Sequence, residues 1–132
     1  WSAMWRKFTF IVTVSGVGAL LRAPVGVIRS LAGPRQMLAE CIAEVVQVGR
    51  ARGVALPPDL EQVTLAFIDN MAPAVTASMQ RDILAGKPSE LEAQNGAVVR
   101  MGEQAGIPVP VNCLIYASLL PQELRARGEL SF

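Results

Sequence analysis

PRQMLAECIAEVVQVGRARG occupies residues 34–53 of this 132-residue chain. Its small and apolar residues recur at steps of three and four, the spacing that places side chains on one face of an α-helix: Met37, Leu38, Cys41, Ile42, Val45, Val46 and Gly49. Pro34 suits the first turn of a helix, and Gly53 suits the position just after the last turn. The stretch therefore predicts a helix over residues 34–52 with one buried face.

The same periodicity runs through nearly the whole chain and predicts an all-α domain. A length of 132 residues is enough for one domain with a single core. Pro121 should kink or end the last helix, since proline lacks the backbone N–H that a helix interior uses. Besides residues 34–52, the pattern predicts helices over residues 58–71, 76–85, 89–106 and from 112 onward.

The longest apolar run, residues 8–21, allows two interpretations. Residues 8–14 are β-branched and aromatic enough for a strand, and the glycines of residues 16–21 match the start of a dinucleotide-binding fingerprint. We reject that interpretation because no second strand follows, and the acid expected about 20 residues later falls inside the strongest helix, as Glu40. We expect a buried core helix whose glycines allow another helix close, shorter than the roughly 20 apolar residues of a membrane span.

Residues 87–112 contain a capping box and a spare acid. In such a box the oxygen of Ser89 accepts an N–H of the first turn, and Glu92 accepts the N–H of the serine. Gly106 fits the left-handed position after the last turn. Glu92 thus has a structural task and Glu90 has none. Because any acid gains about 0.3–1 kcal/mol in a first turn, Glu90 is either a solvated surface residue or a functional one.

Composition excludes several kinds of function. The chain is 52% hydrophobic and 17% charged with a net charge of +1, and its basic residues are scattered, so no nucleic-acid face is expected. It has no histidine and no cluster of metal ligands, and we interpret Cys41 and Cys113 as small core residues. Ten of the twelve basic residues are arginines, which keep their proton near neutral pH. Only Lys7 and Lys87 carry a side-chain amine, which can give up a proton and so serve as a general acid. No signal peptide is recognisable, and we expect a cytoplasmic protein without membrane contact.

Three motifs in order resemble the C-terminal domain of ketopantoate reductases, the 2-dehydropantoate 2-reductases. They are residues 5–26, which begin Trp-Arg-Lys-Phe; residues 78–83, Ser-Met-Gln-Arg-Asp-Ile; and residues 90–112, which begin Glu-Leu-Glu-Ala-Gln-Asn-Gly. The resemblance spans nearly the whole chain. It implies that residues 1–132 form a helical substrate-binding and catalytic domain, similar to the C-terminal part of 6-phosphogluconate dehydrogenase. Such a domain normally follows a Rossmann domain that binds NADPH, which these residues do not contain.

The resemblance also implies roles for particular residues. Lys7 matches the lysine that acts as general acid toward the ketone oxygen, and Glu90 matches the glutamate that holds the substrate and positions the lysine. Ser78 stands twelve residues before that glutamate, where the family has a substrate-binding serine. Without the resemblance, Lys7 would be interpreted as a surface lysine at a helix start and Ser78 as a possible helix cap.

The chain departs from the family at three positions that carry asparagine in its typical members. Ile11, Ser15 and Val75 stand there, and of these only Ser15 keeps a polar side chain for the substrate. The first hypothesis is therefore an NADPH-dependent reductase of a 2-keto acid, possibly 2-dehydropantoate in pantothenate biosynthesis, and possibly a homodimer. The alternative is a helical dimerisation or interaction module that has lost catalysis, which the two apolar replacements favour slightly.

Overall fold

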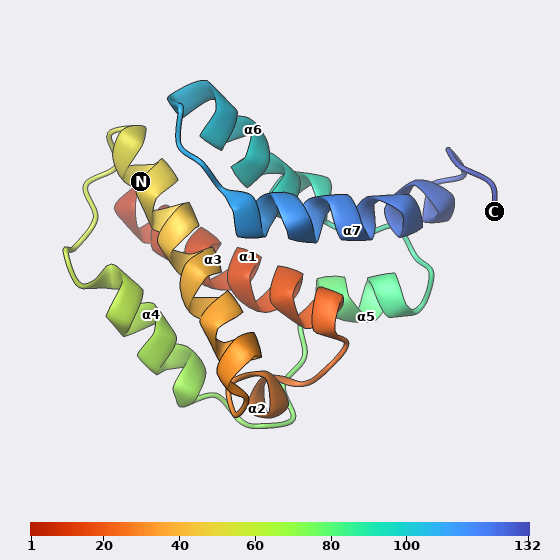
Figure 1. Cartoon of the computed structure of the whole chain (residues 1–132), viewed down its shortest axis with the longest axis horizontal. Helices are drawn as coiled ribbons and strands as arrows, with labels where there is room; N and C mark the ends of the chain where they lie inside the picture. The colour runs from red at the N-terminus through yellow and green to blue at the C-terminus, as the bar shows by residue number, and fades with distance from the viewer.

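The computed structural model describes all 132 residues and contains helices only, which confirms the predicted all-α class. Figure 1 shows α1 running through the middle of the molecule, with the two ends of the chain at opposite ends of its long axis. The helices are α1 (Ser2–Leu21), α2 (Val25–Ile28), α3 (Ala32–Ala51), α4 (Leu60–Asp69), α5 (Ser78–Leu84), the π-helix η1 (Glu92–Gly96), α6 (Ala97–Ala105) and α7 (Pro110–Ala126).

Helix α1 is the central element because it packs against α2, α3, α4, α5, η1 and α7. Helices α3 and α4 lie side by side along one flank of the molecule, and α6 and α7 lie together along another (Figure 1). The main core cluster joins α1 and α3 to residues of α4, α5 and α7, and includes Val17, Leu38, Ile42, Ile68 and Ile115. A second, smaller cluster surrounds Trp5, close to the start of α1.

Helix α3 confirms the prediction made from residues 34–53. It begins two residues before Pro34 and ends at Ala51, and Gly53 follows in the left-handed conformation with φ of 85°. Six of the seven residues in the predicted stripe are buried: Leu38, Cys41, Ile42, Val45, Val46 and Gly49. Helices α4 and α5 are confirmed within two residues at each end.

Helix α1 confirms the core-helix interpretation of residues 8–21, but it is longer than that run. It has 20 residues, and its most apolar 18-residue window has a mean hydropathy of 1.2, so by length and composition alone it could span a membrane. In the fold, 56% of its most apolar 18-residue window is buried by the other helices. That burial is what the core helix of a folded domain shows.

The single helix expected from Ser89 to Gly106 is wrong in its first half. The chain first makes a π-turn in which Gly96 N–H donates to Leu91 C=O at 3.0 Å, five residues back, and only then continues as α6. Gly106 ends α6 with φ of 68°, as predicted. A π-turn inserts one residue into a helix, and such turns occur often at functional sites.

Of the two outcomes expected at Pro121, a kink or an end of the helix, the end is wrong, because α7 continues through that residue to Ala126. Pro121 faces solvent. Leu119 and Glu123, two residues before and two residues after it, lie on the opposite face of the helix and are buried. Their anchoring outweighs the missing backbone hydrogen bond. Cys113, expected in the core, is exposed on the first turns of α7, whereas Cys41 is fully buried as expected.

Candidate active site

Lys7 lies on the exposed side of α1 and makes no hydrogen bond or ion pair with the protein. It borders a groove of about 450 Å³ between α1 and α4. Two cations lie beside each other on this wall, Arg6 and Lys7, and the facing wall is largely apolar. The other lining residues are Phe10, Pro57, Asp59, Leu60, Val63, Thr64 and Phe67.

The position of Lys7 is fixed by the burial of Trp5. The Nε1–H of Trp5 donates to the backbone carbonyl of Val45 on α3 at 3.0 Å, and the indole packs over Gly49. Residues 5 and 7 are about 200° apart around a helix, so the contact that buries Trp5 turns Lys7 outward. The amine is therefore free to meet a ligand, on a backbone that cannot rotate.

Ser15 shares a face of α1 with Lys7 and Ile11, because residues four apart lie above one another on a helix. Unlike Lys7, Ser15 is buried among the other helices, and its hydroxyl forms no hydrogen bond with the protein. Ile11 is half-buried between them. The face thus changes from exposed at Lys7 to covered at Ser15, about two turns further along α1.

Ser78 is the first residue of α5 and is exposed, and its side chain does not cap the helix. Two residues later, Gln80 is buried, with its Nε2 donating to the Ala23 carbonyl at 3.1 Å. Gln80 lies directly over Gly18 of α1, since a Cβ at Gly18 would come within 2.5 Å of its Oε1. The glycine notch therefore holds the start of α5, and Ser78 with it, against α1, as the sequence predicted for these glycines.

Gly16 forms a second notch of the same kind, which receives Asn95 from η1. A Cβ at Gly16 would lie 2.6 Å from Oδ1 of Asn95, and Asn95 is completely buried. Its Nδ2 donates to Oδ1 of Asn112 at 3.0 Å, whose own backbone N–H donates to Glu44 at 2.9 Å. One buried amide thus ties η1 to α1 and to the start of α7.

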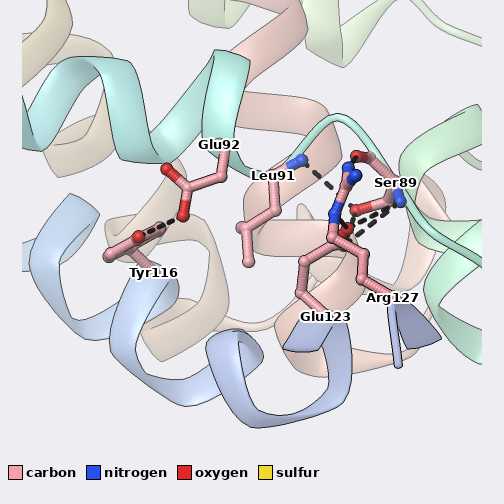
Figure 2. A network of polar contacts seen from close by, with 6 residues as sticks. All are labelled: Ser89, Leu91, Glu92, Tyr116, Glu123 and Arg127. Carbon is pink, nitrogen blue, oxygen red and sulfur yellow. Dashed lines mark hydrogen bonds and ion pairs between the residues drawn. The ribbon is translucent and has the colours of Figure 1, made fainter. Parts of the chain in front are cut away.

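Glu90 is exposed and has no side-chain partner, but both of its neighbours are buried. The predicted capping box is half right. Ser89 Oγ accepts the Leu91 N–H at 3.2 Å, while the Ser89 N–H donates to Glu123 instead of Glu92. Figure 2 shows the two clusters on either side of Leu91, with Ser89, Glu123 and Arg127 on one side.

Glu92 belongs to the other cluster and accepts hydrogen bonds from the Tyr116 hydroxyl and, at 2.8 Å, from Arg100. The hydrogen bond to this carboxylate raises the pKa of Tyr116, with burial adding to the effect. Both partners of Glu92 lie on the same helical layer, α6 and α7. Glu92 therefore has a structural task, as expected, although a different one from the task that the capping box assigned to it.

The four residues singled out from the sequence occupy three segments: α1 itself and two segments that pack on it. Lys7 and Ser15 belong to α1 itself, Ser78 begins α5, and Glu90 precedes η1. No hydrogen bond or ion pair joins any two of them, and the groove at Lys7 is completed by α4 instead of by Ser78 or Glu90. No group of three or more His, Cys, Asp or Glu side chains lies close enough together to hold a metal ion.

Sequence reasoning missed the residues that hold these segments in place: Gln80, Asn95 and Glu123. Gln80 and Asn95 lie inside motifs that were recognised, and each meets a glycine of α1. The two glycines in residues 16–18 were the available signal, since they indicated close approach but not by which side chain. Glu123 gave no local signal, because its partner Ser89 is 34 residues away.

Three comparisons place this chain among known proteins. The family model described as "Ketopantoate reductase PanE/ApbA C terminal" matches residues 1–123. The 2-dehydropantoate 2-reductase of Caulobacter vibrioides is 34% identical over 115 residues, which are 87% of this chain and 39% of that protein. The chain thus spans about two fifths of the length of that relative.

Solved structures agree with the sequence match. A PanE/ApbA family ketopantoate reductase from Ralstonia eutropha JMP134 has a TM-score of 0.85 and 29% identity, over 96% of this chain and 42% of that one. D-mandelate dehydrogenase in complex with NADH has a TM-score of 0.81 and 19% identity, over 95% of this chain and 43% of that one. The second likeness is one of fold alone.

Proposed function

Because the chain belongs to the ketopantoate reductase family, as its C-terminal domain, we propose that it is the substrate-binding and catalytic domain of an NADPH-dependent 2-keto acid reductase. Its first candidate substrate is 2-dehydropantoate, the compound named by its curated relatives. The observation that carries the proposal is Lys7, an unpaired amine on a rigid helix at the edge of a groove.

The proposed chemistry follows from the charge that reduction creates. As the carbonyl carbon of a 2-keto acid becomes tetrahedral, negative charge grows on its oxygen. The ammonium of Lys7 stabilises that charge and then transfers a proton to the oxygen, which gives the 2-hydroxy acid. Ser78 and Ser15 would contact the substrate, and Glu90 would hold the substrate and orient the lysine.

The hydride comes from a nicotinamide, and the residues of this chain do not fit a dinucleotide by themselves. The glycines that resemble a dinucleotide fingerprint, Gly16 and Gly18, are filled by Asn95 and Gln80. We therefore propose that NADPH is held mainly by an N-terminal Rossmann domain, and that the 132 residues alone are inactive. In the proposed reaction this domain supplies the proton and binds the substrate.

The test uses the full-length protein that carries this domain, with NADPH and either 2-dehydropantoate or smaller 2-keto acids. Lys7→Ala should lower kcat at least about 100-fold, the usual contribution of a general acid. Glu90→Ala should raise KM and lower kcat. Lys87→Ala removes the only other amine side chain and should leave turnover unchanged. Turnover of none of these acids, or full activity in Lys7→Ala, would reject the proposal.

A second candidate function is a helical interaction module that has lost catalysis. The observation that favours it is the apolar wall of the groove, where Val63 and Phe67 are 53% and 60% exposed. Ile11, in place of an asparagine one turn from Lys7, makes this part of α1 still more apolar, and Val75 replaces a second asparagine near the other end of α1. Light scattering tests this candidate: a dimer that becomes monomeric in Val63→Asp supports it, and a monomeric full-length protein counts against it.

A further inference from the structure

We propose that Glu123 is a positioning residue for Glu90, acting through the backbone and hydroxyl of Ser89. The inference rests on the proposed function, because it assigns a task to Glu123 in the same reaction. Glu123 belongs to the last turns of α7, and neither its sequence position nor the family resemblance singles it out. The residues that contact Glu123 are what single it out.

Glu123 is the most buried acid of the chain, with 1% of its surface exposed. Its Oε1 accepts the hydroxyl of Ser89 at 2.5 Å, and its two oxygens accept the backbone N–H of Ser89 at 3.1 and 3.0 Å. The Nε–H of Arg127 donates to Oε2 at 2.7 Å, and Nη2 of the same side chain donates to the Ser89 carbonyl at 2.9 Å. Figure 2 shows both side chains, Glu123 from α7 and Arg127 from just after its end, reaching this one serine.

Together these bonds occupy every polar group of Ser89. Its hydroxyl both donates to Glu123 and accepts the N–H of Leu91, and its N–H and carbonyl are each paired. Leu91 is fully buried in the main core cluster. Glu90 is therefore held between two fixed residues, and its own carboxylate is left without a partner.

The element that carries Glu123 is itself fixed at its other end. At the start of α7, the carboxylate of Glu44 accepts the backbone N–H groups of Val111 and Asn112, each at 2.9 Å. Glu44 belongs to α3, which also packs along α1. A short chain of buried contacts therefore fixes the position of Glu90 relative to α1, the helix that carries Lys7. It runs from α1 to α3, from α3 to α7, and from Glu123 on α7 to Ser89.

The bonds from Glu123 and Arg127 to Ser89 form a clamp, and this clamp is sensitive to the replacement of a single atom of Glu123. The Ser89 N–H and the Arg127 Nε–H can only donate, so both require an acceptor at position 123. In Glu123→Gln the amide oxygen can still accept both obligate donors at the Oε2 position, but the NH₂ group then faces the Ser89 N–H at the Oε1 position. The Ser89 hydroxyl also loses the acceptor to which it donates, and the bond from Arg127 is no longer made to a charged group. The expected result is a loosened loop and a displaced Glu90, with the side-chain volume unchanged.

The experiment is a double-mutant cycle in the full-length protein, with NADPH and the best 2-keto acid found. Glu123→Gln should raise KM or lower kcat about tenfold, since residues that share contacts couple by such amounts. In a Glu90→Gln background the same change should cost less than about twofold, because nothing remains to be positioned. Ser89→Ala removes only the hydroxyl from the clamp and should give a smaller effect of the same kind.

Glu92→Gln is the matched control, an acid in the same segment whose partners lie on the other side of Leu91. It should leave kcat and KM within about twofold of the parent values. If Glu123→Gln and Ser89→Ala lower the melting temperature but leave the kinetics unchanged, or if their effect persists in full without Glu90, the positioning role is wrong. Wild-type kinetics in Glu90→Gln alone would overturn the role proposed for Glu90, and this inference with it.

Discussion

Gly49→Ala should destabilise the chain, although alanine is the better helix former. Gly49 lies in the last turns of α3 beneath the indole of Trp5. A Cβ at this position would lie 2.6 Å from Cε2 and 2.7 Å from Cδ1 of the ring, and nearer still to Nε1. The indole is rigid and buried, and its Nε1–H is bonded to the carbonyl of Val45, so the ring cannot bend away as the end of a long side chain would.

The expected change in the free energy of unfolding is the sum of one stabilising and two destabilising contributions. Alanine in a helix interior is worth about 1 kcal/mol relative to glycine. Against this, overpacking of a core costs about 1–3 kcal/mol, and breaking the bond from Trp5 to Val45 costs about 1 kcal/mol more. Complete expulsion of the indole would approach the 3–5 kcal/mol of a Trp→Ala change. We expect a net loss of about 2 kcal/mol.

The assay is urea unfolding of the 132-residue chain, followed by circular dichroism and by tryptophan emission in a Trp1→Phe background, which isolates Trp5. Gly49→Ala should lower the midpoint and shift the emission of the folded state to the red. Gly33→Ala is the matched control: it lies in the first turn of the same helix with nothing within 4 Å of its Cβ, and should stabilise by about 0.5 kcal/mol. A Gly49→Ala chain as stable as the parent, with unchanged emission, would refute the close contact.

Two further predictions concern titratable side chains. The hydrogen bond from Arg35 holds the pKa of Asp69 below its usual value, so the pair stabilises the fold above the unfolded-state pKa of about 4 and ceases to do so as pH falls through the lower, folded-state pKa. In urea unfolding, Asp69→Asn should therefore cost about 0.5 kcal/mol at pH 7 and clearly less at pH 3, because the pair is exposed; equal losses at both would contradict this. Burial raises the pKa of the fully buried Cys41 thiol to about 12, whereas Cys113 is exposed, so a thiol reagent at pH 8 should modify one cysteine quickly and the other only in urea. Two fast thiols in the folded chain would contradict the burial of Cys41.

The helices could be predicted where one face of a segment carries the whole signal. Helix α3 has a continuous apolar stripe and terminal Pro34 and Gly53, and its limits were predicted within two residues. The errors occur where a contact distant in sequence outweighs a local rule. Pro121 does not end α7 because buried residues on both sides hold the helix, and Glu123, 34 residues away, takes the Ser89 N–H that the capping box assigned to Glu92.

The candidate site was predictable in its residue types but not in its arrangement. Composition left two amines, Lys7 and Lys87, and an acid without a structural task, Glu90; the resemblance to the ketopantoate reductases then selected Lys7 and Glu90. The placement of the segment of Glu90 on α1 depends on Asn95 entering the notch at Gly16, and that of Ser78 depends on Gln80 entering the notch at Gly18. Periodicity detects which face of a helix is buried, but it does not reveal which polar side chain fills a gap in that face.

The buried acids show why a sequence alone overestimates the number of catalytic candidates. Glu44 and Glu123 are both deeply buried, and each uses its carboxylate to accept backbone N–H groups at one end of a segment. A buried charge is costly unless it is fully paired, so these two acids are committed to holding the backbone. Glu92 is committed to Tyr116 and Arg100. Glu90 differs from all three because its carboxylate has no partner while the backbone on either side of it is fixed, which is the arrangement that a substrate-binding acid requires.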